Sequence, residues 1–166
     1  MCDMEDVCIR KMEVHEYPLL KDFLYEAIFV SKDDVAPARS ILLQPELKLY
    51  YEGFGEKRED VCFVAVMENH IIGACWIRCM KDYGYVDDTT PSLAMSLYKA
   101  YRSKHIGTKL MHAMLGYAKE NSIAQLSLSV QKENYAYNMY KKLGFQIVEE
   151  KEDEYIMIYN VEKGKI

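Results

Sequence analysis

The sequence has little of what interrupts or disorders a chain. Only 8 of its 166 residues are glycine and 4 are proline, whereas half are hydrophobic. Disordered and collagen-like chains have the opposite composition, so both classes are excluded. The length lies within the range of about 100–200 residues that is usual for one domain. We therefore expect one globular domain over residues 1–166.

Long apolar runs are also missing. The best run, residues 71–77, is far shorter than the roughly 18 residues that a membrane-spanning helix needs. The first residues, Met1 to Asp6, are acidic at a place where a secretory signal would be basic. We therefore expect a cytoplasmic protein with no membrane partner.

An excess of positive charge and a metal-binding pattern are absent too. The 26 acidic and 21 basic residues leave a net charge of −5, which disfavours general binding to nucleic acid. The five cysteines include no C-x-x-C pair, so neither a disulfide framework nor a zinc site is indicated. The four histidines are not spaced as metal ligands either. We expect no metal, and reduced thiols packed as small hydrophobic groups.

Hydrophobic periodicity predicts alternating strands and helices. Gly144 follows an apolar helical pattern and is placed for a left-handed C-terminal cap. The pattern predicts an α/β fold: a mixed, mostly antiparallel central sheet of about six to seven strands flanked by helices. Strands are expected over residues 7–12, 61–67, 71–80, 92–98, 124–130 and 155–161 and from residue 145, and helices over 17–29, 37–49, 106–121 and 134–143.

A basic segment stands out in this acidic chain. Residues 102–108, RSKHIGT, lie between an expected strand and an expected long helix. The free N–H groups and the dipole of a helix start attract anions, and Gly107 permits close approach of a ligand to the backbone. Neither a Walker loop nor a Rossmann fingerprint is present. The segment alone fits either an anion site or a solvated basic helix start.

Two motifs carry a resemblance to a known family. Residues 92–110, SLAMSLYKAYRSKHIGTKL, resemble the acetyl-coenzyme A signature of the GNAT superfamily of N-acetyltransferases, in which the loop reads Q/R-x-x-G-x-G/A. Residues 134–145, NYAYNMYKKLGF, resemble the family's N-x-A-x-x-L-Y-x-x-x-G-F pattern. The resemblance covers about residues 60–148, and His105 stands where the family usually has glycine.

The resemblance implies a binding site for acetyl-CoA as co-substrate. Met95 and Leu97 are expected to offer backbone groups to the pantetheine arm and the thioester carbonyl. Asn134 matches the asparagine near the pantetheine, and Tyr140 matches the tyrosine beside the sulfur. The pyrophosphate is expected on the loop formed by Arg102, Ser103, Lys104, His105, Ile106, Gly107 and Thr108.

The implied reaction needs a base and an acid. An attacking amine must lose a proton, and the departing thiolate is helped by a hydroxyl, for which Tyr140 is the candidate. Ser92 stands where relatives often carry a glutamate, so the base is left open between Asp88 and water, with Asp87 and Glu133 also near in sequence. Direct transfer is favoured over a cysteine intermediate because no histidine partner is evident for Cys75 or Cys79.

We therefore predict transfer of the acetyl group to a primary amine, on a small molecule or a peptide, by direct attack in a ternary complex. The enzyme is expected to be a monomer or a homodimer. Acidic and tyrosine side chains of the loop after residue 80, among them Asp82 and Tyr83, favour a cationic acceptor. One alternative is a non-catalytic acyl-CoA-binding or sensing module, because Ser92 and His105 depart from the family pattern. Another is an interaction domain whose basic loop is only a helix start.

Overall fold

The computed structural model describes residues 6–162. Its helices are α1 (Leu20–Ala27), α2 (Pro45–Lys48), α3 (Ile106–Glu120) and α4 (Ala136–Leu143), with 3-10 turns η2 (Val14–Leu19), η3 (Arg39–Leu43) and η4 (Lys99–Tyr101). Its strands are β1 (Cys8–Lys11), β2 (Val61–Met67), β3 (His70–Arg78), β4 (Ser92–Leu97), β5 (Gln125–Gln131), β6 (Gln146–Glu150) and β7 (Glu154–Asn160). The predicted order of elements is confirmed.

The strands form one seven-stranded sheet in the order β1-β2-β3-β4-β5-β7-β6. All neighbouring strands are antiparallel except β4 and β5, which run parallel. A parallel pair needs a long crossover, and here α3 supplies it between the two strands. The sheet is therefore mixed and mostly antiparallel, as expected.

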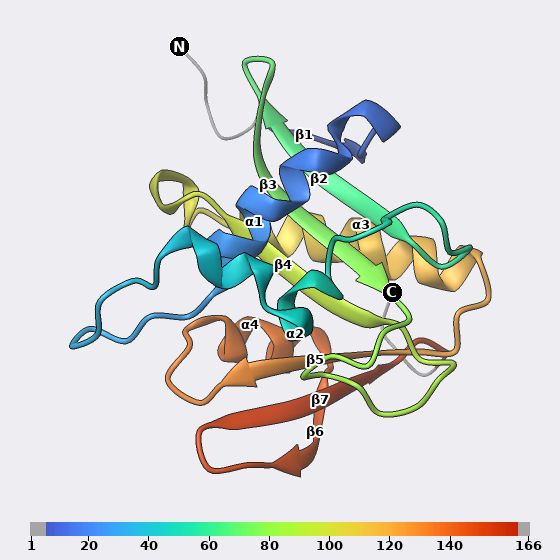
Figure 1. Ribbon diagram of the computed structural model, residues 1–166. Coiled ribbons are helices and arrows are strands. Elements are labelled where there is room, and N and C mark those ends of the chain that lie inside the picture. The colour runs from blue at the N-terminus through green and yellow to red at the C-terminus, as the bar shows by residue number, and fades with distance from the viewer. Residues whose placement is uncertain (1–5, 163–166) are drawn as a thin grey trace.

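The sheet separates two hydrophobic cores (Figure 1). On one face, α3 and α4 pack through residues such as Leu110, Met114 and Tyr140. On the other face, α1 and the segment that holds η3 and α2 pack over Trp76 and its neighbours. Because β2 and β3 contribute side chains to both cores, they are buried on both faces, which fits their continuous apolar sequences.

Two predicted helices differ from the observed ones. The pattern over 17–29 divides into η2, which contains Pro18, and the shorter α1, because proline has no N–H to continue a helical ladder. The helix expected over 37–49 is also divided, into η3 and α2. Gln44 precedes Pro45 and is extended, with φ −66° and ψ 139°, since a residue before proline avoids the helical region. Gly144 has φ 113° and caps α4 as predicted.

The thiols are less uniformly packed than expected. Cys62 and Cys75 are buried, but Cys79 is partly exposed and Cys8 is exposed; these four are free. Cys2 and most of the acidic start of the chain belong to residues 1–5, outside the described part. None of the helices within residues 6–162 has the length and apolar character that crossing a bilayer requires.

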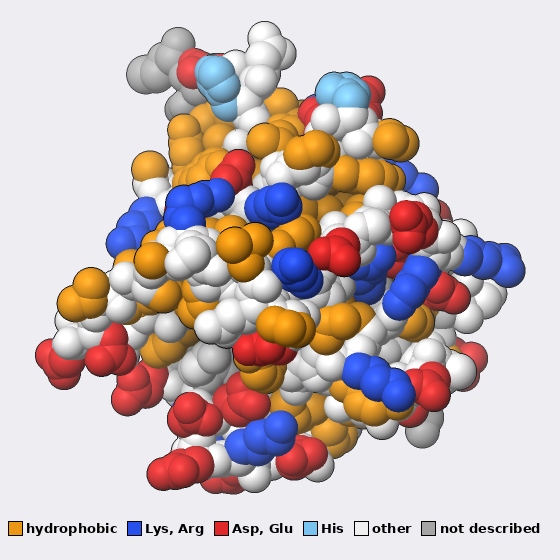
Figure 2. Space-filling model, in the orientation of Figure 1, with side chains coloured by type: hydrophobic (Ala, Val, Ile, Leu, Met, Phe, Trp, Pro, Cys, Tyr) orange, Lys and Arg blue, Asp and Glu red, His pale blue; other side chains and the backbone are white. Residues whose placement is uncertain are grey.

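Charge is unevenly spread over the surface. Figure 2 shows acidic side chains gathered along the lower rim of the molecule, where Figure 1 places β6 and β7, and lysine and arginine side chains across its middle. Strand β6 and the turn between β6 and β7 carry the exposed residues Glu149, Glu150, Glu152 and Asp153. The acid excess of the sequence is thus partly concentrated at one edge strand and the turn beside it.

Candidate active site

The parallel strands β4 and β5 separate soon after they meet. They share one register pair, Ser92 with Ser127, and the Ser127 N–H donates to the Pro91 carbonyl over 3.0 Å. On its other side, β4 pairs with β3 along its whole length, from Ser92 to Leu97. One edge of β4 therefore loses its neighbouring strand for most of its length.

The residues predicted to hold the pantetheine face this unpaired edge. The Tyr98 N–H donates to the Ile72 carbonyl over 3.1 Å, and the β3–β4 register continues without a shift. Hydrogen-bonding direction alternates along an antiparallel pair, so Met95 and Leu97 point their backbone groups away from β3. Their N–H groups lie where β5 has moved away, so a ligand there could accept a hydrogen bond from each.

The loop after β4 leads into the first turn of α3. Ser103 and His105 both have positive φ, 61° and 65°, and His105 is the residue that precedes α3. The Lys109 N–H donates to the His105 carbonyl over 3.3 Å, whereas the N–H groups of residues 106–108 have no acceptor among the described residues. Three unpaired N–H groups at the positive end of a 15-residue helix suit a phosphate.

The Arg102 side chain has a different place from the one its charge predicted. Its Nε donates to the Leu97 carbonyl over 2.9 Å, and its Nη2 donates to the Glu26 carbonyl over 3.1 Å. The same nitrogen lies 3.4 Å from the Glu26 carboxylate. Arg102 therefore braces the loop against β4 and the end of α1, and Lys104 and His105 are two further exposed basic side chains of the loop.

Gly107 connects the two motifs in space. A Cβ atom at this position would lie 3.2 Å from the Met95 Cε and 3.6 Å from the Met139 Sδ. The first turn of α3 thus touches both β4 and α4, and a larger side chain would push into them. The glycine that sequence analysis assigned to ligand approach also serves close packing of the site.

Tyr140 lies beneath the same part of β4. Its side chain is 6% exposed, and its ring centroid is 5.7 Å from that of Phe145. Burial, and secondarily the neighbouring Cys75, raise the pKa of its hydroxyl. Cys75 is the register partner of Met95, so Tyr140 lies close to the strand predicted to hold the pantetheine. The hydroxyl has no hydrogen-bond partner among the described residues and remains protonated at neutral pH.

Asn134 serves its own helix in this structure. Its Oδ1 accepts a hydrogen bond from the Ala136 N–H over 2.9 Å, and its carbonyl accepts one from the Tyr137 N–H over 3.1 Å. These bonds start α4 and so place Tyr140. The Asn134 amide nitrogen has no partner within the described part of the chain and is the atom left for a ligand.

The carboxylates considered as the base lie in unlike surroundings. Asp88 is exposed and accepts a hydrogen bond from the Tyr85 hydroxyl over 2.6 Å. Asp87 accepts hydrogen bonds from the Thr89 and Thr90 N–H groups, and hydrogen bonding at this turn lowers its pKa. Glu133 is exposed. None of these three is buried beside Tyr140 or β4.

A fourth carboxylate, Asp82, is half-buried at the start of β4. The Ser92 hydroxyl donates to Asp82 Oδ1 over 2.6 Å, and the Tyr50 hydroxyl also bonds to this side chain. Burial raises the pKa of Asp82, whereas these hydrogen bonds lower it by less. Asp82 was predicted only as an acidic loop residue, because no local sequence pattern indicates that the loop brings it back to Ser92, ten residues later.

An apolar pocket of about 240 Å³ lies on the α1 face of the sheet. It is lined by residues of α1 and α2, by Tyr50 and Tyr83, and by Gln131 at the end of β5. With Ser92 level with Ser127, the parallel register places Gln131 level with Ser96 across the opening. The pocket thus reaches the end of β5, beside the opening, from the face opposite α3 and α4.

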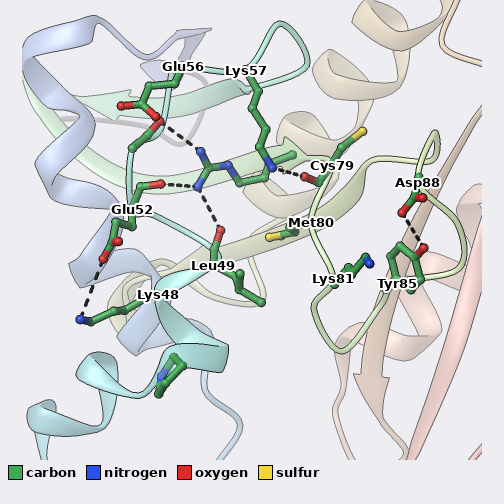
Figure 3. Close-up of a pocket in the computed structure, with 13 residues that line it drawn as sticks. Lys48, Leu49, Glu52, Glu56, Lys57, Cys79, Met80, Lys81, Tyr85 and Asp88 are labelled. Atoms are coloured by element: carbon green, nitrogen blue, oxygen red, sulfur yellow. Dashed lines mark hydrogen bonds and ion pairs between the residues drawn. The ribbon is translucent and has the colours of Figure 1, made fainter.

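A larger, open hollow of about 950 Å³ lies where β3 ends at Arg78 (Figure 3). Arg78 in its wall donates to the Leu49, Glu52 and Gly53 carbonyls and forms a pair with Asp60, at 3.0 and 3.1 Å. Lys57 donates to the Cys79 carbonyl over 2.7 Å. Arg78 and Lys57 hold residues 49–60 against the end of β3. Their charges are therefore used to stabilise the fold at this hollow.

The thiols and the acidic residues near the N-terminus offer little chemistry. Burial raises the pKa of both Cys62 and Cys75, which leaves their thiols protonated and unreactive at neutral pH. Glu13, His15 and Glu16 lie within 4.8 Å of one another, although spacing predicted no metal site for His15. Glu16 is already held by Arg10, whose nitrogens lie 2.8 and 2.9 Å from its carboxylate.

Comparison with known proteins relates the chain to one family. A family model described as the acetyltransferase (GNAT) domain matches residues 58–147, over half of the chain. Streptothricin acetyltransferase A of Bacillus subtilis is 33% identical over 94 residues, which are 55% of this chain and 51% of that protein. The matched region is therefore about half the length of this curated relative.

Solved structures share the fold over nearly the whole chain. The PaiA N-acetyltransferase of Thermoplasma acidophilum, solved in complex with coenzyme A, matches 93% of this chain and 98% of its own, with a TM-score of 0.68 and 18% identity. The ribosomal-protein-S18-alanine N-acetyltransferase of Escherichia coli matches 93% of this chain and 94% of its own, with a TM-score of 0.65 and 14% identity. At such identities these structures establish the fold alone, and they confirm the predicted architecture.

Proposed function

Because the chain belongs to the GNAT acetyltransferase family, we propose that it transfers the acetyl group of acetyl-CoA to a primary amine by direct attack in a ternary complex. The observation that carries this proposal is the opening between β4 and β5, which two sites approach from opposite faces of the sheet. The anion-binding loop and Tyr140 lie toward the α3 and α4 face, and the apolar pocket lies toward the α1 face.

Acetyl-CoA would be held mainly by backbone groups. The unpaired N–H groups of residues 106–108 would bind its pyrophosphate, and exposed Lys104 and His105 would add positive charge. The unpaired edge at Met95 and Leu97 would bind the pantetheine, and one of these N–H groups would stabilise the negative charge that develops on the thioester oxygen. The amide nitrogen of Asn134 supplies a further donor.

Tyr140 would act as the acid. Its protonated hydroxyl lies near Met95 and Cys75 and can donate to the sulfur as the carbon–sulfur bond breaks. A covalent cysteine intermediate is disfavoured because the Cys75 thiol is buried and protonated, with Met111 Sδ as its partner at 3.9 Å. The acetyl group would therefore pass directly from sulfur to nitrogen, with no acetyl-enzyme intermediate.

The acceptor would be an amine carried on an apolar stem. Leu24, Ile28, Ile41 and Leu47 supply an aliphatic wall, and the tyrosine rings nearby can attract a cation. Streptothricin is the first acceptor to test, because the curated relative is a streptothricin acetyltransferase. Spermidine and an alanine-initiated peptide are the next, from the names of two structural neighbours. The composition supports a cytoplasmic enzyme, working as a monomer or a homodimer.

The rival is a sensing module that binds acetyl-CoA without turnover. Ser92 and His105, the departures from the family pattern, favour it over the enzyme. The test measures release of the coenzyme A thiol with and without streptothricin, spermidine or the peptide, beside calorimetric binding of coenzyme A. We expect acceptor-dependent release with at least one amine. Binding without release would favour the sensor, and absence of binding would favour an interaction domain.

A further inference from the structure

The loop between β3 and β4 brings a carboxylate to the start of β4. Asp82 accepts the Ser92 hydroxyl over 2.6 Å and the Tyr50 hydroxyl, and the backbone of Gly84 also donates to it. No lysine, arginine or histidine of the described residues forms an ion pair with Asp82. Its charge is thus held by neutral donors, in a half-buried place, with no cation to keep it ionised.

The surroundings of Asp82 are rigidly built. Gly84 lies so close to β5 that an added Cβ would be 3.0 Å from the Leu128 carbonyl carbon. Tyr50 is 7% exposed, and its carbonyl accepts the indole N–H of fully buried Trp76 over 3.0 Å. Both ends of the hydrogen-bonded path from Tyr50 to Asp82 are therefore fixed by packing.

This path begins at the proposed acceptor pocket. Tyr50 lines the pocket, whereas Asp82 does not line it and bonds to the Tyr50 hydroxyl. Burial raises the pKa of Asp82, which makes its carboxylate a stronger proton acceptor than an exposed aspartate. Asp88, the base considered from sequence, lines the other hollow and bonds only to Tyr85.

We infer that Asp82 accepts the proton lost by the acceptor ammonium, that the Tyr50 hydroxyl relays it, and that Ser92 holds the carboxylate in position. This inference rests on the proposed acetyl transfer. One nitrogen–hydrogen bond breaks as Tyr50 takes that proton and passes its own to Asp82. The freed electron pair forms the nitrogen–carbon bond, and the carbon–sulfur bond breaks. Tyr140 gives its proton to the departing sulfur and takes the second proton lost by nitrogen in its place, and Asp82 returns the first to water.

The test compares Asp82→Asn with Asp88→Asn, the same change on a carboxylate of the same loop. The probe is whichever of streptothricin, spermidine or the alanine-initiated peptide the wild type acetylates fastest. We expect kcat/KM at pH 7 to fall about 10²-fold for Asp82→Asn, the usual contribution of a general base. Asp88→Asn should remain within about twofold of wild type on the same scale. Coenzyme A affinity should stay unchanged in both variants.

A pH profile separates a proton acceptor from a purely structural residue. Without Asp82, reaction depends on amine that is already neutral in solution, and this fraction rises about tenfold per pH unit below the pKa of the amine, which is near 10 for an alkyl amine and near 8 for a peptide N-terminus. The deficit of Asp82→Asn should therefore shrink steadily as the pH rises from 7 toward the pKa of the amine used. Among the described residues, the titratable side chain that bonds to Asp82 is Tyr50, and burial raises its pKa, so it should not distort the profile in this range.

Tyr50→Phe gives a second measurement that does not depend on Asp82→Asn folding. It removes the relay and keeps the carboxylate, so its deficit should also shrink with rising pH. A deficit that is constant with pH in both variants would overturn the inference, as would loss of activity in Asp88→Asn alone. If wild type acetylates none of the three amines, the proposed function fails first, and that result is distinct from these.

Discussion

The two ends of β4 differ in how completely their backbone is paired with neighbouring strands. At the Ser92 end, the strand is paired on both sides, and nearby Arg78, 5% exposed in its side chain, is fully committed to Asp60 and three carbonyls. At the Leu97 end, the neighbouring strand is gone, and Arg102, 42% exposed, is held by two carbonyls and one long ion pair. The strand therefore has a fully paired backbone at its first end and backbone groups without a neighbouring strand at its second end.

The largest effect should come from breaking the rigid end. Arg78→Met leaves the Asp60 carboxylate, whose side chain is 0% exposed, without a cation. Breaking such a buried pair should lower the free energy of unfolding by about 3–5 kcal/mol. Urea unfolding measures it. Arg39→Met, which breaks an exposed pair with Asp22, is the control and should cost less than about 1 kcal/mol. Equal losses of unfolding free energy in both variants would show that the Ser92 end of β4 does not depend on the buried pair.

A loss of catalysis without loss of fold should come from the open end. Tyr140→Phe removes a hydroxyl that bonds to no described residue, so the free energy of unfolding should hardly change. Turnover should fall about 10²-fold while coenzyme A affinity is kept, since the acid acts on the leaving sulfur. Tyr137→Phe, on the same helix and packed on Tyr155, should keep its turnover and is the matched control. Unchanged turnover in Tyr140→Phe would exclude its role as the acid.

A smaller effect is expected from the exposed arginine. Arg102→Met removes the brace between the phosphate loop and the Leu97 carbonyl. We expect coenzyme A to bind about tenfold more weakly, a loss of about 1.4 kcal/mol, with an unfolding change below about 1 kcal/mol. Isothermal titration with coenzyme A measures the first quantity and urea unfolding the second. A stability loss as large as that of Arg78→Met would show that both arginines are structural.

The smallest effect should be a gain in stability when His105 is replaced by glycine. His105 adopts a left-handed conformation that costs a non-glycine residue roughly 1–2 kcal/mol. His105→Gly should therefore raise the unfolding free energy by up to about 1 kcal/mol and keep coenzyme A binding. Lys104→Gly changes a neighbour with no positive φ and should slightly destabilise the protein. Weaker coenzyme A binding by His105→Gly would assign the imidazole a direct contact with phosphate.

Local sequence patterns predicted the fold well, because strand alternation and helix periodicity are local properties. They also placed the loop before α3 and the Tyr140 helix in the right order. The features that these patterns missed depend on contacts between residues far apart in the sequence. The charge of Arg102 gave no sign that Glu26 and Leu97 would engage it, and the loop that carries Asp82 back to Ser92 has no periodic signal. The division of the helix over 37–49 was readable from Pro45 alone.

Binding of the coenzyme at the open end of β4 is tested most directly by amide hydrogen exchange with and without acetyl-CoA. If the open end of β4 holds the coenzyme, the amides of Met95, Leu97 and residues 106–108 should exchange more slowly in its presence, and those around Arg78 should not change. Protection that is absent from the first set, or that gathers around the hollow beside Arg78, would contradict the account.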